Sequence, residues 1–326
     1  MNNVHYLTLS TISINVNDHQ FIAGKVGANI AYVMSIKHTC NELVIIDIDR
    51  DRAEGEVMDI VHGLPFLNQM NIRVGDYPDV KGCDIIVLTA GAGRKPGETR
   101  LDLAVKNCQI AKAMSSSIMK YYDGGIILVV SNPVDVLTYH VSKWTGLPRG
   151  TVVGSGTVLD GIRFRTLLAD KFNIDMKNVH AYILGEHGES QFPAWEFSKI
   201  AGFSIDEYCK VSGITLTDDE REDIAIQTKR AGAEIIKRKG ATYYGIGITT
   251  NELCTTMLHD ENTIRTVGCI LDGEFGISDV VVSLPCILGK RGVEKILELE
   301  LPKNELALLK KSAESVRKVI EVTKDV

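Results

Sequence analysis

A histidine, an aspartate and an arginine near the middle of the chain have the types and spacing that proton transfer and carboxylate binding need. His187 stands between glycines in Gly185-Glu186-His187-Gly188, just after an apolar run. Asp160 and Arg163 are three residues apart in a segment with a helical pattern, so they share one helix face. A histidine donates protons near neutral pH, and a carboxylate behind it fixes its tautomer and raises its pKa. His187 and Asp160 are therefore candidates for acid–base chemistry, and Arg163 is a candidate for binding a carboxylate.

Arg163 and a second arginine, Arg100, have the chemistry needed to bind a substrate. A guanidinium binds a carboxylate through two parallel hydrogen bonds, which suits Arg163 as a substrate anchor. Arg100 ends the Gly- and Pro-rich segment 90–100, which follows an apolar strand and has the composition of a mobile flap. A cation that closes over a carbonyl would polarise it and exclude water. Together these residues suit hydride transfer to a 2-keto acid, with His187 supplying the proton.

The first half of the chain predicts the elements that position this chemistry. Three short runs, 43–47, 85–90 and 126–130, are apolar on both faces, which is typical of parallel strands covered by helices. Segment 103–122 has room for a crossover helix. This rhythm predicts an α/β Rossmann-type doubly wound parallel sheet, with ligands at the carboxyl ends of its strands. Asn132 follows the third run and is expected at that edge.

After about Gly146 the pattern changes. We expect an NAD-binding Rossmann domain over residues 1–150 and an α+β substrate-binding and catalytic domain over 151–326, sharing a cleft. The expected elements of the second domain are a helix over 157–172, a strand over 179–184, a helix from the Thr217–Glu220 capping box to Arg238 with Gly240 as its cap, a strand over 279–288 and a final helix after Pro302.

A partial dinucleotide signal lies near the N-terminus. Gly24 and Gly27 resemble the tail of a G-x-G-x-x-G loop, whose helix N-terminus binds the pyrophosphate. Asp47 ends an apolar strand 23 residues later, where a carboxylate accepts from the ribose hydroxyls and favours NAD over NADP. However, Ile22 stands at the first glycine position, and residues 15–20 are too polar for a buried strand. Either residues 7–16 form the first strand with a longer connection, or the extreme N-terminus is aberrant.

Composition excludes several functional classes. The net charge of −6, with both signs mixed along the chain, argues against a nucleic-acid partner and against a membrane-surface protein. No apolar run reaches the roughly 20 residues that span a bilayer. The seven cysteines include no C-x-x-C pair, which disfavours a disulfide scaffold or a metal site. With no signal-peptide pattern, we expect a cytoplasmic protein.

From about Gly24 to the C-terminus, the sequence resembles the L-lactate/malate dehydrogenase family, and most of all its bacterial L-lactate dehydrogenases. The stretches that carry the resemblance are 53–59, 95–103, 154–160 and 183–188. The resemblance implies that His187 is the proton donor and acceptor, that Asp160 is its partner, and that Arg163 anchors the substrate carboxylate. It also implies that Arg100 is the flap arginine. The substrate and cofactor residues that it implies are Asn132 and Thr242 for the substrate, and Val26, Asp47, Arg52, Tyr77, Gly91, Ala92, Ser131 and Asn132 for NAD.

The same resemblance implies regulation and assembly. Arg165 and His180 match the pair that binds fructose 1,6-bisphosphate in the allosteric bacterial enzymes. On a helix, Arg165 lies about 200° around from Arg163, so it faces away from the active site. The family's oligomer is a homotetramer, which we expect here.

One residue departs from the lactate dehydrogenase pattern. Arg94 stands where most lactate dehydrogenases carry Gln and malate dehydrogenases carry Arg. A guanidinium facing the methyl group of pyruvate would be unpaired, whereas it would pair with the second carboxylate of oxaloacetate. Thr242 and the Arg165–His180 pair favour lactate. We expect an L-lactate dehydrogenase, with malate dehydrogenase as the alternative and a cofactor-deficient binding or structural protein as a further one.

Overall fold

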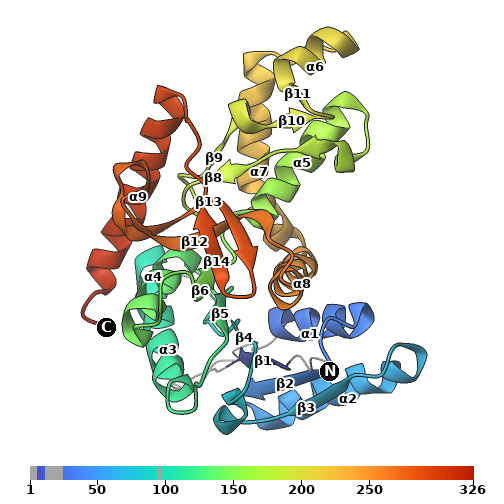
Figure 1. Ribbon diagram of the computed structural model, residues 1–326, viewed down its shortest axis with the longest axis vertical. Coiled ribbons are helices and arrows are strands. Elements are labelled where there is room, and N and C mark those ends of the chain that lie inside the picture. The colour runs from blue at the N-terminus through green and yellow to red at the C-terminus, as the bar shows by residue number, and fades with distance from the viewer. Residues whose placement is uncertain (1–5, 12–24, 94–96) are drawn as a thin grey trace.

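A computed structural model of the chain describes residues 6–11, 25–93 and 97–326. Within this part, one nine-stranded sheet runs through the molecule in the order β14-β13-β12-β6-β5-β4-β1-β2-β3 (Figure 1). Its six N-terminal strands are parallel, and the last three are antiparallel. The strands are β1 (Tyr6–Thr11), β2 (Glu42–Asp47), β3 (Asn71–Val74), β4 (Ile85–Leu88), β5 (Ile126–Val129), β6 (Val152–Gly154), β12 (Thr263–Asp272), β13 (Ser278–Gly289) and β14 (Gly292–Ile296).

The parallel half has the strand order of a doubly wound dinucleotide fold. All three apolar runs expected as strands are strands β2, β4 and β5. The central strand β1 precedes the polar stretch and pairs with both β2 and β4. The first strand expected within residues 7–16 is thus β1, which ends at Thr11, and residues 12–24 lie outside the described residues.

Helices cover both faces of the sheet because the strands are apolar on both sides. In β4, Ile86 and Leu88 pack on one face, whereas Ile85 and Val87 pack on the other. The first face is covered by α3 (Arg100–Ile118), α4 (Val134–Thr145) and α9 (Lys303–Thr323). The second is covered by α1 (Lys25–Lys37), α2 (Arg50–Gly63) and α8 (Tyr244–Leu258).

A smaller unit with its own core lies above the sheet in Figure 1. Its helices are α5 (Val158–Phe172), α6 (Ile205–Ser212) and α7 (Asp218–Lys239). The Thr217–Glu220 capping box and the Gly240 cap of α7 are confirmed. The strand expected over 179–184 is instead split in two, since residues 181 and 182 separate its halves. The short strands are β7 (Val179–His180), β8 (Ile183–Leu184), β9 (Phe192–Pro193), β10 (Lys199–Ile200) and β11 (Phe203–Ser204).

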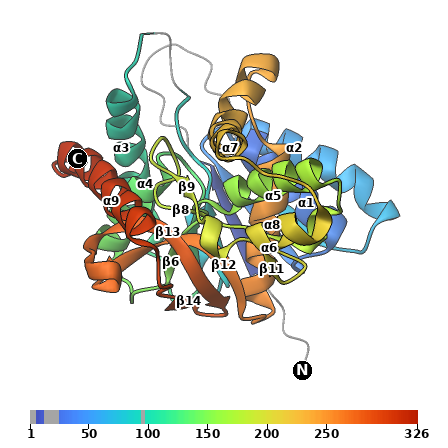
Figure 2. The same ribbon diagram turned by 90° about the horizontal axis from the view of Figure 1, so that it is seen from above.

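Single turns of 3₁₀ helix connect several of these elements. They are Leu64–Phe66, Tyr77–Val80, Met176–Asn178, Trp195–Phe197 and Glu274–Gly276. Seen from above in Figure 2, α5 and α7 lie on one side of the β8–β9 segment, and α4 and α9 lie on the other. No helix in the described part of the chain has the length and apolar character needed to cross a membrane.

Candidate active site

Asp160 is the centre of the candidate site. It lies in the first turn of α5, and only 2% of its side chain is exposed. Its Oδ2 lies 2.6 Å from Nδ1 of His187, and its Oδ1 accepts a hydrogen bond of 2.8 Å from Arg163. The i, i+3 spacing on α5 places Asp160 and Arg163 on one face, as the sequence predicts. One buried carboxylate thus joins the imidazole to the guanidinium.

The electrostatics of this cluster favour proton transfer. Burial alone would raise the pKa of Asp160, but the charge and hydrogen bond of His187 and the charge of Arg163 outweigh it and hold that pKa below its ordinary value. Burial would lower the pKa of His187, yet the charge and hydrogen bond of Asp160 raise it above its ordinary value. Because Nδ1 faces Asp160, Nε2 is the ring nitrogen that can exchange a proton with a substrate.

The backbone around His187 is fixed by contacts that sequence reasoning missed. Gly185 has φ of +92° and exchanges two backbone hydrogen bonds with Ser283 of β13, and a Cβ at Gly185 would lie 2.5 Å from Oγ of Ser312. The next two backbone N–H groups donate to Ser312 of α9 and to Asp135 of α4. A signal was present for Asp135, since a charged residue interrupts an otherwise apolar helix start. No signal marked Ser312.

Arg100 is the first residue of α3, whose capping box is formed by Thr99 and Asp102. Its guanidinium donates to Oε1 of Glu189 at 2.7 Å, and 70% of its side chain is exposed. Glu189 is only two residues after His187, so Arg100 lies at the rim of the site rather than within the Asp160 cluster. Arg94, on the same segment, lies outside the described residues.

The loops after β4 and β5 meet at the carboxyl edge of the sheet. Asn107 of α3 joins them, because it accepts from the backbone N–H of Ala92 at 2.8 Å and donates to the carbonyl of Asn132 at 2.7 Å. The hydroxyl of Ser131 donates to the carbonyl of Ala90 at 2.5 Å. Gly91 lies in the first of these loops. The sequence-predicted residues Gly91, Ala92, Ser131 and Asn132 are thus brought together.

A second group of expected cofactor residues lies along the same edge. Asp47 ends β2 opposite Thr11, the last residue of β1. Its carboxylate accepts from the backbone N–H of Asp49 at 2.9 Å, and an acceptor there suits ribose hydroxyls. The first turn of α1 holds Val26 and the buried Gly27, and the free N–H groups of a helix start suit phosphate. This donor set fits a dinucleotide.

The remaining expected residues are more scattered. Arg52 of α2 pairs with Glu56 at 3.9 Å, and burial raises the pKa of Tyr77 to about 12. Thr242 is half-buried between α7 and α8. Gly24, like Ile22 of the glycine motif, lies outside the described residues.

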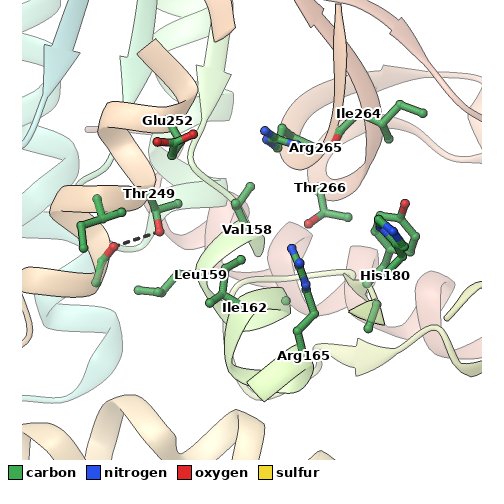
Figure 3. Close-up of a pocket in the computed structure, with 15 residues that line it drawn as sticks. Val158, Leu159, Ile162, Arg165, His180, Thr249, Glu252, Ile264, Arg265 and Thr266 are labelled. Carbon is green, nitrogen blue, oxygen red and sulfur yellow. Dashed lines mark hydrogen bonds between the residues drawn. The ribbon is translucent and has the colours of Figure 1, made fainter. Parts of the chain in front are cut away.

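Arg165 and His180 line a different cavity, of about 400 Å³, on the other side of α5 (Figure 3). Arg265 of β12 and Glu252 of α8 also line it. Burial and the positive charge of Arg265 lower the pKa of Arg165. Nε of Arg165 is buried without a partner among the described residues. The cavity therefore brings two guanidinium groups together away from the Asp160 cluster.

Comparisons with known proteins agree with this geometry. The profile of the lactate/malate dehydrogenase NAD-binding domain matches residues 22–154, and that of the family's alpha/beta C-terminal domain matches residues 157–326. The L-lactate dehydrogenase of Thermoanaerobacter sp. (strain X514) is 46% identical over 299 residues, which cover 92% of this chain and 96% of that protein. The L-lactate dehydrogenase of Priestia megaterium is 46% identical over 290 residues, covering 89% and 91%.

Solved structures give the same result for the whole fold. The L-lactate dehydrogenase from Clostridium thermocellum is 50% identical, with a TM-score of 0.84, and the match covers 97% of this chain and 98% of that one. A lactate dehydrogenase from a Medee basin deep-sea metagenome library is 38% identical, with a TM-score of 0.92 and coverage of 98% and 99%. Both halves of the sequence and the fold as a whole thus lead to one conclusion: this chain belongs to the lactate/malate dehydrogenase family.

Proposed function

We propose that the protein is an NAD-dependent L-lactate dehydrogenase that reversibly interconverts pyruvate and L-lactate. The observation that carries the proposal is the shared carboxylate of Asp160, which holds a proton donor and a carboxylate anchor beside each other. The relatives named L-lactate dehydrogenase, at 42–46% identity, support it. The chain's cofactor is NAD, the ligand for which its N-terminal domain is named.

In this mechanism His187 carries the proton. Bound NADH supplies the hydride, and the protein must supply a proton to the carbonyl oxygen as negative charge develops there. Asp160 stabilises the imidazolium before transfer and keeps Nδ1 as its own partner, so Nε2 gives up the proton. In lactate oxidation, the same nitrogen accepts it.

The arginines act on the substrate. Arg163 binds the carboxylate through its two parallel N–H groups. Arg100 leaves Glu189 and closes over the carbonyl, which it polarises while water is excluded. Asn132 and Thr242 line the substrate pocket. In this proposal the cofactor domain comprises residues 1–150 and the substrate domain comprises residues 151–326. The residues that contact NAD are Gly24, Val26, Gly27, Asp47, Arg52, Tyr77, Gly91, Ala92, Ser131 and Asn132.

Substrate choice is tested by measuring kcat/KM for pyruvate and for oxaloacetate on one preparation. We expect a preference for pyruvate, which Arg94→Gln should increase by about tenfold or more, because it removes a charge that only a dicarboxylate can pair. A preference of the unmodified protein for oxaloacetate would identify a malate dehydrogenase instead. NADH titration addresses the remaining alternative: a protein that binds no NADH at high micromolar concentration is a cofactor-deficient homologue.

We further propose that Arg165 and His180 bind fructose 1,6-bisphosphate in a cytoplasmic homotetramer. Two guanidinium groups that repel each other, Arg165 and Arg265, are stabilised when an anion of high charge binds between them. The effector should raise affinity for pyruvate by about 5- to 150-fold, the usual range of allosteric coupling. Arg165→Gln should abolish that response, as measured by the KM for pyruvate with and without the effector. Sedimentation velocity tests the tetramer, and an unmodified protein that ignores the effector contradicts this regulation.

A further inference from the structure

Three consecutive backbone N–H groups of the His187 loop are each fixed by a different element. That of Gly185 donates to the carbonyl of Ser283 in β13 at 3.0 Å. That of Glu186 donates to Oγ of Ser312 in α9 at 2.6 Å, and that of His187 donates to Oδ2 of Asp135 in α4 at 2.7 Å. Asp160 of α5 contacts the imidazole ring, so four elements hold His187 and its loop in place. The loop is therefore positioned by side chains as well as by the sheet.

The side chains of Ser312 and Asp135 are both buried, but their chemistry differs. Ser312 is fully buried and neutral, and its hydroxyl also lies 2.9 Å from that of Ser190. Asp135 is 3% exposed and bears a carboxyl group, whose Oδ1 has no partner among the described residues. A neutral acceptor would satisfy the His187 N–H group at a lower desolvation cost. An effect of the negative charge on the neighbouring imidazole would explain why an aspartate, rather than a neutral acceptor, lies here.

The charged groups around Asp135 are those of the active site. His187 attracts its negative charge, whereas Glu186 and Asp160 repel it. Burial raises the pKa of Asp135 to about 7, with these two carboxylates adding to the effect and the His187 backbone bond opposing it. The position of Asp135 in the first turn of α4 favours the anion, because the helix dipole is positive there. Its charge therefore changes near the pH at which the imidazole works.

Asp160 and Asp135 act on His187 in different ways. Asp160 is paired with Arg163, which keeps it ionised through the reaction. Asp135 has no guanidinium partner within the described residues, and its charge raises the pKa of His187 in addition to the larger effect of Asp160. Arg163 opposes both. The imidazole thus has one constant negative neighbour and one that titrates.

We propose that Asp135 is a positioning residue for the reaction: it fixes the His187 backbone and, by its charge, favours the protonated imidazole. The inference rests on the proposed function, in which His187 is the proton donor. The sign follows directly. At alkaline pH Asp135 is ionised and holds the proton on His187, so its loss lets that proton leave at a lower pH. Reduction of the keto acid, which needs protonated His187, then fails at a lower pH.

The test is Asp135→Asn, which keeps an acceptor for the His187 N–H group and removes the charge. The alkaline limb of kcat/KM for pyruvate should move down by about one pH unit, while the dissociation constant of NADH stays the same. The NMR titration of the His187 ring, in ¹⁵N-histidine-labelled protein without cofactor, should show the same shift. An unchanged limb together with an unchanged titration overturns the proposal.

Ser312→Ala is the matched control, because it removes the neighbouring bond to the loop without removing a charge. It should lower the melting temperature and kcat and leave the pH limb in place. A limb that moves equally in both variants would overturn the proposal, since the shift would then come from loop distortion. If Asp135→Asn does not fold, Asp135→Ser takes its place, because serine also offers a neutral acceptor to the His187 N–H group. An alkaline limb that Asp135→Ser leaves unchanged overturns the proposal.

Failure of this inference is distinguishable from failure of the proposed function. If His187→Ala retains turnover, then the proton-donor assignment is wrong, and the inference falls with it. If His187→Ala is inactive while Asp135→Asn behaves like the unmodified protein, then only the inference fails.

Discussion

Replacing His187 with alanine should lower kcat for pyruvate reduction by about 10³- to 10⁴-fold, the upper range for loss of a general acid. The imidazole is the group in the Asp160 cluster that can change its protonation near neutral pH, since the pKa of Asp160 is held low and an arginine does not titrate. Without it, the proton must come from water. Stopped-flow measurement of NADH oxidation at saturating pyruvate gives kcat directly.

The pH dependence separates loss of the acid from loss of the fold. Because Asp160 raises the pKa of His187, the imidazole stays protonated above its ordinary range, and the unmodified protein loses pyruvate-reducing activity only as the pH rises through that raised value. The residual activity of His187→Ala should lack this limb, while its NADH affinity changes less than about threefold. His62→Ala, which alters an exposed histidine on α2, should match the unmodified protein. A His187 variant that keeps the limb contradicts the assignment.

The parts of the site that local sequence patterns predict are those set within one element. Asp160 and Arg163 are neighbours because of helix geometry alone, so their spacing was sufficient. Asn132 reaches the sheet edge because it follows a strand that is apolar on both faces. The same argument places Asp47 at the end of β2. Buried strands are recognisable from composition, and their carboxyl ends follow from the parallel topology.

The parts that sequence patterns did not predict depend on contacts between distant elements. Asp135 is 52 residues from His187, and Ser312 is 126 residues from Glu186. Ser312 lies within the apolar stripe of α9, next to Ala313, where a small polar residue fits without disturbing the pattern. No local sequence pattern shows that the hydroxyl of Ser312 accepts a hydrogen bond from the backbone N–H group of Glu186. The first strand is a similar case, because β1 ends at Thr11 and α1 begins at Lys25, and no local rule fixes that separation.

Replacing Arg163 with lysine should reduce kcat/KM for pyruvate by about 10²- to 10³-fold. The free-energy cost of losing one partner of a buried, hydrogen-bonded charge pair is about 2–5 kcal/mol, and lysine recovers only part of it. Its ammonium is a point charge that cannot present two parallel N–H groups to a carboxylate. Only 17% of the Arg163 side chain is exposed, so little water can substitute for the missing donor. Steady-state kinetics at fixed saturating NADH measure the loss.

A graded series of variants separates the contribution of the two parallel N–H groups of Arg163 from that of its positive charge. Arg163→Gln loses both, so it should fall below Arg163→Lys, and both should keep the NADH affinity of the unmodified protein. Arg238→Lys, at the exposed end of α7, is the matched control and should have no effect. The positive charge of Arg163 also lowers the pKa of His187, so the loss of that charge lets the imidazole keep its proton to a higher pH. The alkaline limb should therefore move up in Arg163→Gln more than in Arg163→Lys, because lysine still carries a positive charge. Equal activity of the lysine variant and the unmodified protein would mean that the substrate carboxylate is bound elsewhere.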